Sequence, residues 1–166
     1  MGSVFETERL RFVNIRNDDV DDLLLITSDS QTMRYFSKTL NYQETSEFVN
    51  EILDHYDKYG YCFWKILLKE SKVFIGIAGL LHHDLNEVVE MEIAYRIKRE
   101  YWGNGFATET ARACKEYAKD ILCRKRLISI IHPENVKSIR VAKKLGAERK
   151  SSMIFNGVIH DVYVYS

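Results

Sequence analysis

Two glycines, Gly103 and Gly105, separate a segment that alternates like a strand from a segment with the periodicity of a helix. At such a junction glycine reaches positive φ and lets the backbone come close to a ligand. The helix that follows aims free N–H groups and a partial positive charge back at the turn. This geometry binds pyrophosphate. Because a short Gly-x-Gly also marks ordinary turns, its meaning depends on the segments around it.

Those segments predict an α/β domain with a mixed sheet. Residues 88–97 alternate, residues 127–131 form a continuous apolar run, and Asn156-Gly157 is a strong hairpin signal. Strands are predicted over residues 9–16, 61–68, 73–82, 88–97, 127–131, 147–155 and 158–165. Helices are predicted over residues 18–28, 45–59, from the glycine turn to about 120, and 135–145. The strand–helix order after residue 88 implies locally parallel pairing.

Composition narrows the classes of partner. The 166 residues carry 24 basic and 24 acidic side chains, which argues against nucleic-acid binding through bulk charge. The three cysteines form no C-x-x-C pair, and no long apolar span occurs. We therefore expect a single domain over residues 1–166 in a reduced, cytoplasmic setting, with no metal, nucleic-acid or membrane partner.

The run 101–109, Tyr-Trp-Gly-Asn-Gly-Phe-Ala-Thr-Glu, resembles the acetyl-CoA signature of the GNAT N-acetyltransferases, in particular the ribosomal-protein N-terminal acetyltransferase group. Further segments resemble the same group in the same order. They are Thr7-Glu8-Arg9-Leu10, Glu92-Ile93-Ala94-Tyr95, Asn135-Val136-Lys137-Ser138 with 144–148, and Asn156-Gly157 with His160-Asp161. One departure is Glu100, which stands where the family carries Gln or Arg.

The resemblance implies a GNAT fold: a central mixed sheet of about seven strands, helices on both faces, and splayed fourth and fifth strands. It also implies acetyl-CoA as cosubstrate and an amine as acceptor, and a homodimer is consistent with the analogy. The residues that it assigns to the coenzyme are Tyr95, Arg96, Ile97, Gly103, Asn104, Gly105, Phe106, Ala107, Thr108 and Asn135. Asn135 reads equally well as a simple helix N-cap.

The resemblance also suggests catalytic residues. Glu92 matches the fourth-strand glutamate that some GNAT enzymes use as a base, with ion pairing in the sheet as the alternative, and Glu90 is a weaker candidate. Many family members place a Tyr as leaving-group acid where this chain has Ala142. The ribosomal group has a Ser instead, here Ser138, which could also serve as a helix cap.

Several alternatives stay open at this point. Adjacent His82 and His83 point to opposite faces of a strand, which favours surface or substrate-edge roles over chelation of one metal. The acceptor is a protein N-terminus, a polyamine, an amino acid or an aminoglycoside, and the helix pair over residues 18–59 is expected to form its wall. A non-catalytic acyl-CoA sensor is the alternative function, whereas a dinucleotide-binding fold is disfavoured because the third glycine is missing.

Overall fold

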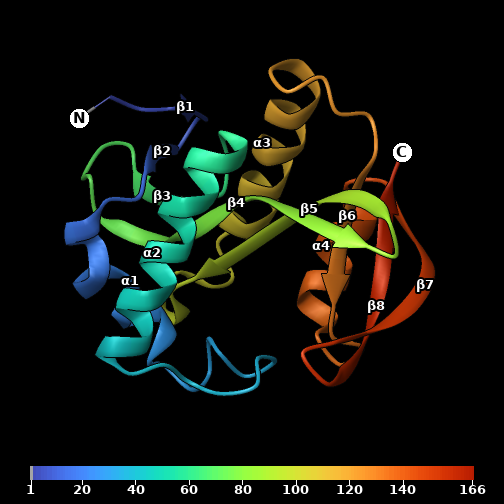
Figure 1. The fold of residues 1–166 in the computed structure, drawn as a ribbon. Helices are drawn as coiled ribbons and strands as arrows, with labels where there is room; N and C mark the ends of the chain where they lie inside the picture. Colours follow the sequence, from blue (N-terminus) through green and yellow to red (C-terminus); the bar gives the residue numbers. More distant parts are fainter. Residues whose placement is uncertain (1) are drawn as a thin grey trace.

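A computed structural model describes residues 2–166 and places a mixed eight-stranded sheet at the centre of the molecule (Figure 1). The strands lie in the order β1-β2-β3-β4-β5-β6-β8-β7. Their bounds are β1 Phe5–Glu6, β2 Leu10–Asn14, β3 Phe63–Leu68, β4 Phe74–Leu85, β5 Val88–Ile97, β6 Leu127–Ile131, β7 Ala147–Phe155 and β8 Val158–Tyr165. The mixed α/β architecture is therefore confirmed, and the strand beyond the predicted seven is the two-residue β1.

Four helices cover the two faces of the sheet (Figure 1). They are α1 Val20–Thr27, α2 Tyr42–Tyr59, α3 Phe106–Asp120 and α4 Val136–Lys144. Two buried clusters result, one beneath α1 and α2 around Leu23 and Ile52, and one beneath α3 around Trp64 and Cys114. Because β3 and β4 are covered on both faces, they are apolar along most of their length instead of alternating.

Local signals explain the ends of α2. Its N-cap Asn41 accepts a hydrogen bond from the backbone N–H of Glu44, and Glu44 reciprocates by accepting one from the N–H of Asn41. This capping box starts the helix at Tyr42, three residues before the predicted start. The helix ends at Gly60, which adopts a φ of 81°.

Among residues 2–166, the pairing between β5 and β6 is the one parallel step in the sheet, and it is very short. Its only register pair is Glu92 with Ile128, whereas β5 pairs with β4 along its full length. Past Glu92 the two strands separate, and β6 continues by pairing with β8. The family's fourth and fifth strands correspond to β5 and β6 here, so the predicted splay is confirmed.

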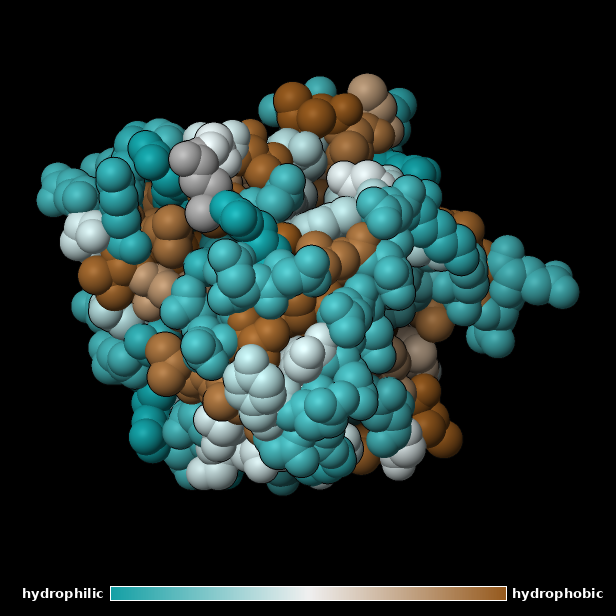
Figure 2. Space-filling view, turned by 60° about the vertical axis from the view of Figure 1, so that its left-hand side comes forward, coloured by the Kyte–Doolittle hydropathy of each residue, from teal (hydrophilic) through white to brown (hydrophobic). Residues whose placement is uncertain are grey.

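The surface of the described residues is mixed in polarity. Figure 2 shows one face of the molecule, on which hydrophobic side chains lie in patches among hydrophilic ones. Within residues 2–166, no helix has the length and apolar character needed to cross a bilayer.

Candidate active site

The glycine turn leads directly into α3. Gly103 and Gly105 adopt φ angles of 78° and 79°, a left-handed conformation that other residues rarely adopt. Gly105 is the N-cap of α3 and has no side chain to occupy the helix end, so the N–H groups of Phe106, Ala107 and Thr108 have no intrahelical partner. The turn therefore presents converging backbone donors at the positive end of a helix dipole.

An N-terminal ion pair fixes this turn. Arg9 Nε donates to Glu109 Oε2 at 2.7 Å, and Arg9 Nη1 donates to the carbonyl of Asn104 at 2.9 Å. Thr7 Oγ1 also donates to Glu109, at 2.6 Å, and the Arg9 guanidinium lies 4.3 Å from the centre of the Phe106 ring. The Thr7-Glu8-Arg9-Leu10 segment thus holds the glycine turn and the first turn of α3 together.

Past Glu92, two of the three carbonyls on the edge of β5 that faces the splay are already engaged. The carbonyl of Ile93 accepts from Ser129 Oγ at 3.0 Å, and the carbonyl of Ile97 accepts from the Trp102 indole at 2.7 Å. Backbone groups of alternate residues point to the same edge of a strand, so those of Tyr95 also point into the gap. Ile97, which we assigned to the coenzyme, already has its carbonyl engaged by Trp102.

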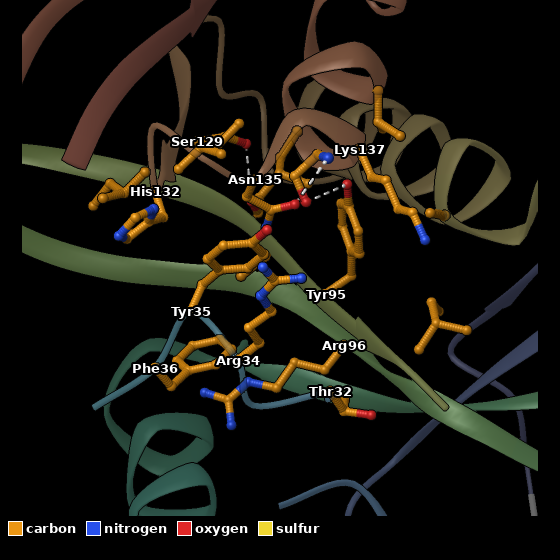
Figure 3. A pocket seen from close by; sticks show the side chains of 18 of the residues that line it. Thr32, Arg34, Tyr35, Phe36, Tyr95, Arg96, Ser129, His132, Asn135 and Lys137 are labelled. Atoms are coloured by element: carbon orange, nitrogen blue, oxygen red, sulfur yellow. Dashed lines mark hydrogen bonds between the residues drawn. The ribbon is translucent and has the colours of Figure 1, made fainter. Parts of the chain in front are cut away.

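A cavity of about 770 Å³ spans the gap between β5 and β6 (Figure 3). The α1–α2 loop covers one side of it: the Tyr35 hydroxyl donates to the carbonyl of Glu134 at 3.1 Å, and its ring lies 5.1 Å from that of His132. Glu92, Ser138 and all of the predicted coenzyme residues except Asn104 line this cavity. The Asn104 side chain instead donates to the carbonyls of Tyr101 and Trp102, and so stabilises the turn from within.

Glu92 lies buried at the rung where the strands begin to separate, with 7 % of its surface exposed. His83 Nε2 on β4 is 2.8 Å from its Oε1, and the backbone N–H of Ile130 donates to its Oε2 at 3.3 Å. Glu90, by contrast, accepts a bidentate bond from Arg126 and does not line the cavity. The structure thus separates the two candidate bases, and it reveals His83 as a contact of Glu92 that sequence reasoning missed.

Tyr95, Asn135 and Ser138 meet at the start of α4, and Figure 3 labels the first two. Asn135 Oδ1 accepts from the backbone N–H of Ser138 at 3.3 Å, which confirms the N-cap reading of Asn135. The Tyr95 hydroxyl donates to Ser138 Oγ at 3.3 Å. Burial raises the pKa of Tyr95 to about 12, against the opposing effect of that hydrogen bond, so the hydroxyl keeps its proton at neutral pH. Sequence reasoning considered only the backbone of Tyr95.

Arg96 departs from its predicted role. Its side chain leaves β5 on the side opposite to Tyr95, toward Phe36 in the α1–α2 loop (Figure 3). Its backbone pairs with Ile77 on β4, so its peptide groups do not face the gap between β5 and β6. We therefore reassign Arg96 from the coenzyme side of the cavity to the side covered by the α1–α2 loop.

The acidic residues of α1 and α2 do not line the cavity. Asp19 and Asp22 instead bind the ammonium of buried Lys65, at 2.6 and 2.7 Å. Burial disfavours the charge of Lys65, but these hydrogen bonds outweigh that effect and raise its pKa. No residue of α1 or α2 lines the cavity, whereas the loop that joins them does; within residues 18–59 the predicted acceptor wall is therefore placed on that loop only, and it stays a prediction.

The cysteines are placed away from this chemistry. None of the three lines the cavity, and burial raises the pKa of the Cys114 thiol to about 12 and that of Cys62 to about 11. Thiols of that kind are poor nucleophiles. Across residues 2–166, no group of His, Cys, Asp and Glu side chains is arranged to hold a metal ion.

Comparison with known proteins identifies this arrangement. The model of the acetyltransferase (GNAT) domain matches residues 9–148. The chain belongs to the GNAT acetyltransferase family. As a GNAT enzyme it is an acyl-CoA-dependent acetyltransferase.

The relatives of this GNAT chain include one protein of uncharacterised activity and acetyltransferases named for different acceptors. It is 33 % identical to the uncharacterised protein YkkB of Bacillus subtilis over 84 % of this chain and 82 % of that protein. It is 25 % identical to the spermidine N(1)-acetyltransferase of Escherichia coli over 90 % of this chain and 78 % of that protein. The fold superposes on RimL, a ribosomal L7/L12 alpha-N-protein acetyltransferase solved with coenzyme A (TM-score 0.76, 17 % identity, 99 % and 96 % of the chains covered).

The residues of this GNAT domain fit acyl-CoA as their cosubstrate. The left-handed glycines and the uncapped start of α3 offer backbone donors to a pyrophosphate. The backbone of Tyr95 faces the cavity where β5 and β6 separate, so an extended amide chain could add to the sheet there. The Lys137 ammonium, 4.6 Å above the Trp102 ring, adds positive charge beside the turn.

Proposed function

We propose that this enzyme transfers an acetyl group from acetyl-CoA to a primary amine, directly and within a ternary complex. The observation that supports this most is the buried carboxylate of Glu92, held at the point where β5 and β6 separate. Acetyl-CoA supplies an activated thioester, and the chain supplies the groups that bind it and move protons. No cysteine lines the cavity to form an acyl-enzyme, so direct transfer suits the site better than a covalent route.

In this proposal Glu92 accepts the proton of the amine. A primary amine is mostly protonated near neutral pH, so a base must remove a proton before the amine can react. His83 is a positioning residue: its contact with Oε1 fixes the carboxylate, and its partly exposed ring leads toward solvent. The N–H of Ile130 holds the second oxygen of Glu92 and so limits its rotation.

The other proposed roles belong to residues on the two sides of the gap, on β5 and at the start of α4. The backbone N–H of Tyr95 would stabilise negative charge that develops on the thioester oxygen, and its carbonyl would accept from the pantetheine amide. Asn135 borders the same path from the start of α4. Ser138, whose Oγ accepts a hydrogen bond from the Tyr95 hydroxyl, would donate a hydrogen bond to the departing thiolate in place of the Tyr that Ala142 replaces, and the thiolate would take its proton from the attacking nitrogen as the amide forms.

The test measures thiol release from acetyl-CoA with a panel of amines, comparing wild type with Glu92→Gln and Glu90→Gln. Both variants remove one buried carboxylate from the same face of β5 and keep its shape. Glu92→Gln is expected to lower kcat about 10²- to 10⁴-fold, the usual contribution of a general base. Glu90→Gln, which only loses its pair with Arg126, should retain most activity. Equal loss in both variants would show that Glu92 acts through stability instead of proton transfer.

A further inference from the structure

Arg96 is a cationic side chain in an aromatic part of the cavity. Its guanidinium carbon lies 4.0 Å from the ring centre of Phe36, 5.2 Å from that of Phe48 and 5.7 Å from that of Phe63. Its one hydrogen bond within the described residues goes to the sulfur of Met33, a weak acceptor, at 3.5 Å. Most of its five N–H donors therefore have no protein acceptor.

This isolation is unusual for an enclosed arginine. Even arginines that are more exposed have carboxylate partners, such as Arg9 with Glu109, Arg126 with Glu90 and Arg149 with Asp161. No carboxylate in residues 2–166 forms an ion pair with Arg96. Burial lowers the pKa of Arg96 to about 10, although the charge of Glu92 acts in the opposite direction, so the side chain is still cationic at neutral pH. A desolvated guanidinium of this kind favours a planar anion that accepts two hydrogen bonds.

We propose that Arg96 binds the carboxylate of the acceptor, and that the acceptor is therefore an amino acid. The inference rests on the proposed function, because it assigns the acceptor of the same site. It concerns the side of the cavity that the α1–α2 loop covers, away from the glycine turn.

The arrangement of β5 supports a zwitterionic acceptor. Glu92, Ala94 and Arg96 project from one face of the strand, with the small Ala94 between the two charged side chains. The carboxylate of Glu92 complements an ammonium, and the guanidinium of Arg96 complements a carboxylate. The space above Ala94 would hold the atoms that join these two groups, and the Phe36 and Phe63 rings would contact an apolar side chain.

The same charge disfavours a polyamine. A second ammonium group would lie near the uncompensated Arg96 and be repelled. Glu92 and Glu134 are the carboxylates that line the cavity, and they are outnumbered there by the cations of Arg34, Arg96, Lys137 and Arg140. Asp19 and Asp22 bind Lys65, and Glu44 pairs with Lys38, all outside the cavity. The cavity therefore differs in charge from what a spermidine-like acceptor requires.

The experiment compares free amino acids with their C-terminal amides as acceptors, beside spermidine and an amidated Ala-starting peptide. Wild type, Arg96→Met, Arg96→Lys and the control Arg11→Met are assayed for acetyl transfer. Arg11 lies on β2, pairs with Glu6 and does not line the cavity. Calorimetry with an amino acid, in the presence of coenzyme A, measures binding separately from turnover.

Wild type should prefer the free amino acid over its amide. Arg96→Met should raise the KM for the acid about 10- to 100-fold and leave that for the amide unchanged, because one charge-assisted pair is lost. Arg96→Lys keeps the positive charge but lacks the planar guanidinium, so its KM for the acid should lie between those of wild type and Arg96→Met. This second variant keeps the test valid if the Met variant folds poorly.

Two results would overturn the inference. One is better turnover of spermidine or of the amidated peptide than of any amino acid, which would leave the proposed acetyl transfer standing. The other is an equal loss on acid and amide in Arg96→Met, which would make Arg96 a structural cation held by its aromatic neighbours. If no amine is acetylated but calorimetry shows amino-acid binding that Arg96→Met abolishes, the Arg96 site stands and the proposed function fails.

Discussion

At the scale of single residues, Tyr95 contributes to the site through both its backbone and its side chain. Its peptide groups face the gap, while its hydroxyl reaches Ser138 on α4. A serine hydroxyl is a weak acid. A second hydroxyl that donates to its oxygen makes the serine a stronger hydrogen-bond donor to a departing thiolate. The pair Tyr95–Ser138 would thus replace the single Tyr that the family often places at position 142.

This pair gives a prediction for double-mutant analysis. Tyr95→Phe and Ser138→Ala should each lower kcat by about tenfold or more. The double variant should have about the same kcat as the less active of the two single variants, because the two hydroxyls act as a unit. Since burial keeps the pKa of Tyr95 near 12, the loss in Tyr95→Phe should be the same across assays between about pH 6 and pH 9. Additive losses would show that the two hydroxyls work independently.

At the scale of elements, the glycine turn depends on a contact made by residues near the N-terminus. Glu109 on α3 is bound by Thr7 and Arg9, which lie between β1 and β2. Burial alone would raise the pKa of Glu109, but these hydrogen bonds outweigh it and the pKa falls below its usual value of 4.5. Since the folded pKa lies below the unfolded one, the stabilisation is complete above about pH 4.5 and disappears as pH falls through the folded pKa.

We therefore predict an acid-sensitive coenzyme site. In wild type, coenzyme A affinity and resistance to urea should both decline as pH drops below about 4.5, as Arg9 loses its charged partner. Glu109→Gln should start with weaker coenzyme binding at neutral pH and show a shallower decline over the same range. Glu148→Gln, at an exposed pair with Lys150 on β7, serves as the matched control. Parallel pH curves for wild type and Glu109→Gln would contradict the assignment.

The strands around the site were readily predicted from sequence. Bounds of β5, β6, β7 and β8 agree with the predicted ranges because alternation, apolar runs and Asn156-Gly157 are local signals. β1 was missed because two residues are too few to show alternation. The start of α2 was placed late, although Asn41 and Glu44 have the spacing of a capping box.

Long-range contacts explain what the sequence did not reveal about the site. Alternation placed Arg96 on the same face as Glu92, yet its neighbours Phe36 and Phe48 come from a loop and a helix distant in sequence. Similarly, His83 reaches Glu92 diagonally across the β4–β5 pair, and this depends on a register that a single strand does not encode.

At the scale of the whole molecule, short-range contacts connect the two parts of the sheet that flank the cavity. They include the single rung between Glu92 and Ile128, the packing of α3 on α4, and the bond from Tyr35 to Glu134. A ligand that adds to the edge of β5 and binds the start of α3 would join these elements further. Binding of that kind stabilises the folded state by mass action.

Acetyl-CoA should accordingly raise the free energy of unfolding by about 2.7 kcal/mol at about 100 times its Kd. The amide of Tyr95 should gain protection from hydrogen exchange, together with the first turn of α3. Gly105→Val, which cannot adopt the observed φ of 79° without strain, should lose both effects. Stabilisation without protection at Tyr95 would show that the coenzyme does not add to β5.

The two tryptophans differ in a way that makes the protein its own optical probe. Trp64 is buried in the core with 2 % of its surface exposed, whereas Trp102 is 38 % exposed, bonded to Ile97 and stacked under Lys137 beside the glycine turn. Trp64 should contribute a constant fluorescence background, and Trp102 should respond when a nucleotide reaches the turn. Unlabelled protein would then report coenzyme arrival in real time, and Trp102→Phe would remove the signal.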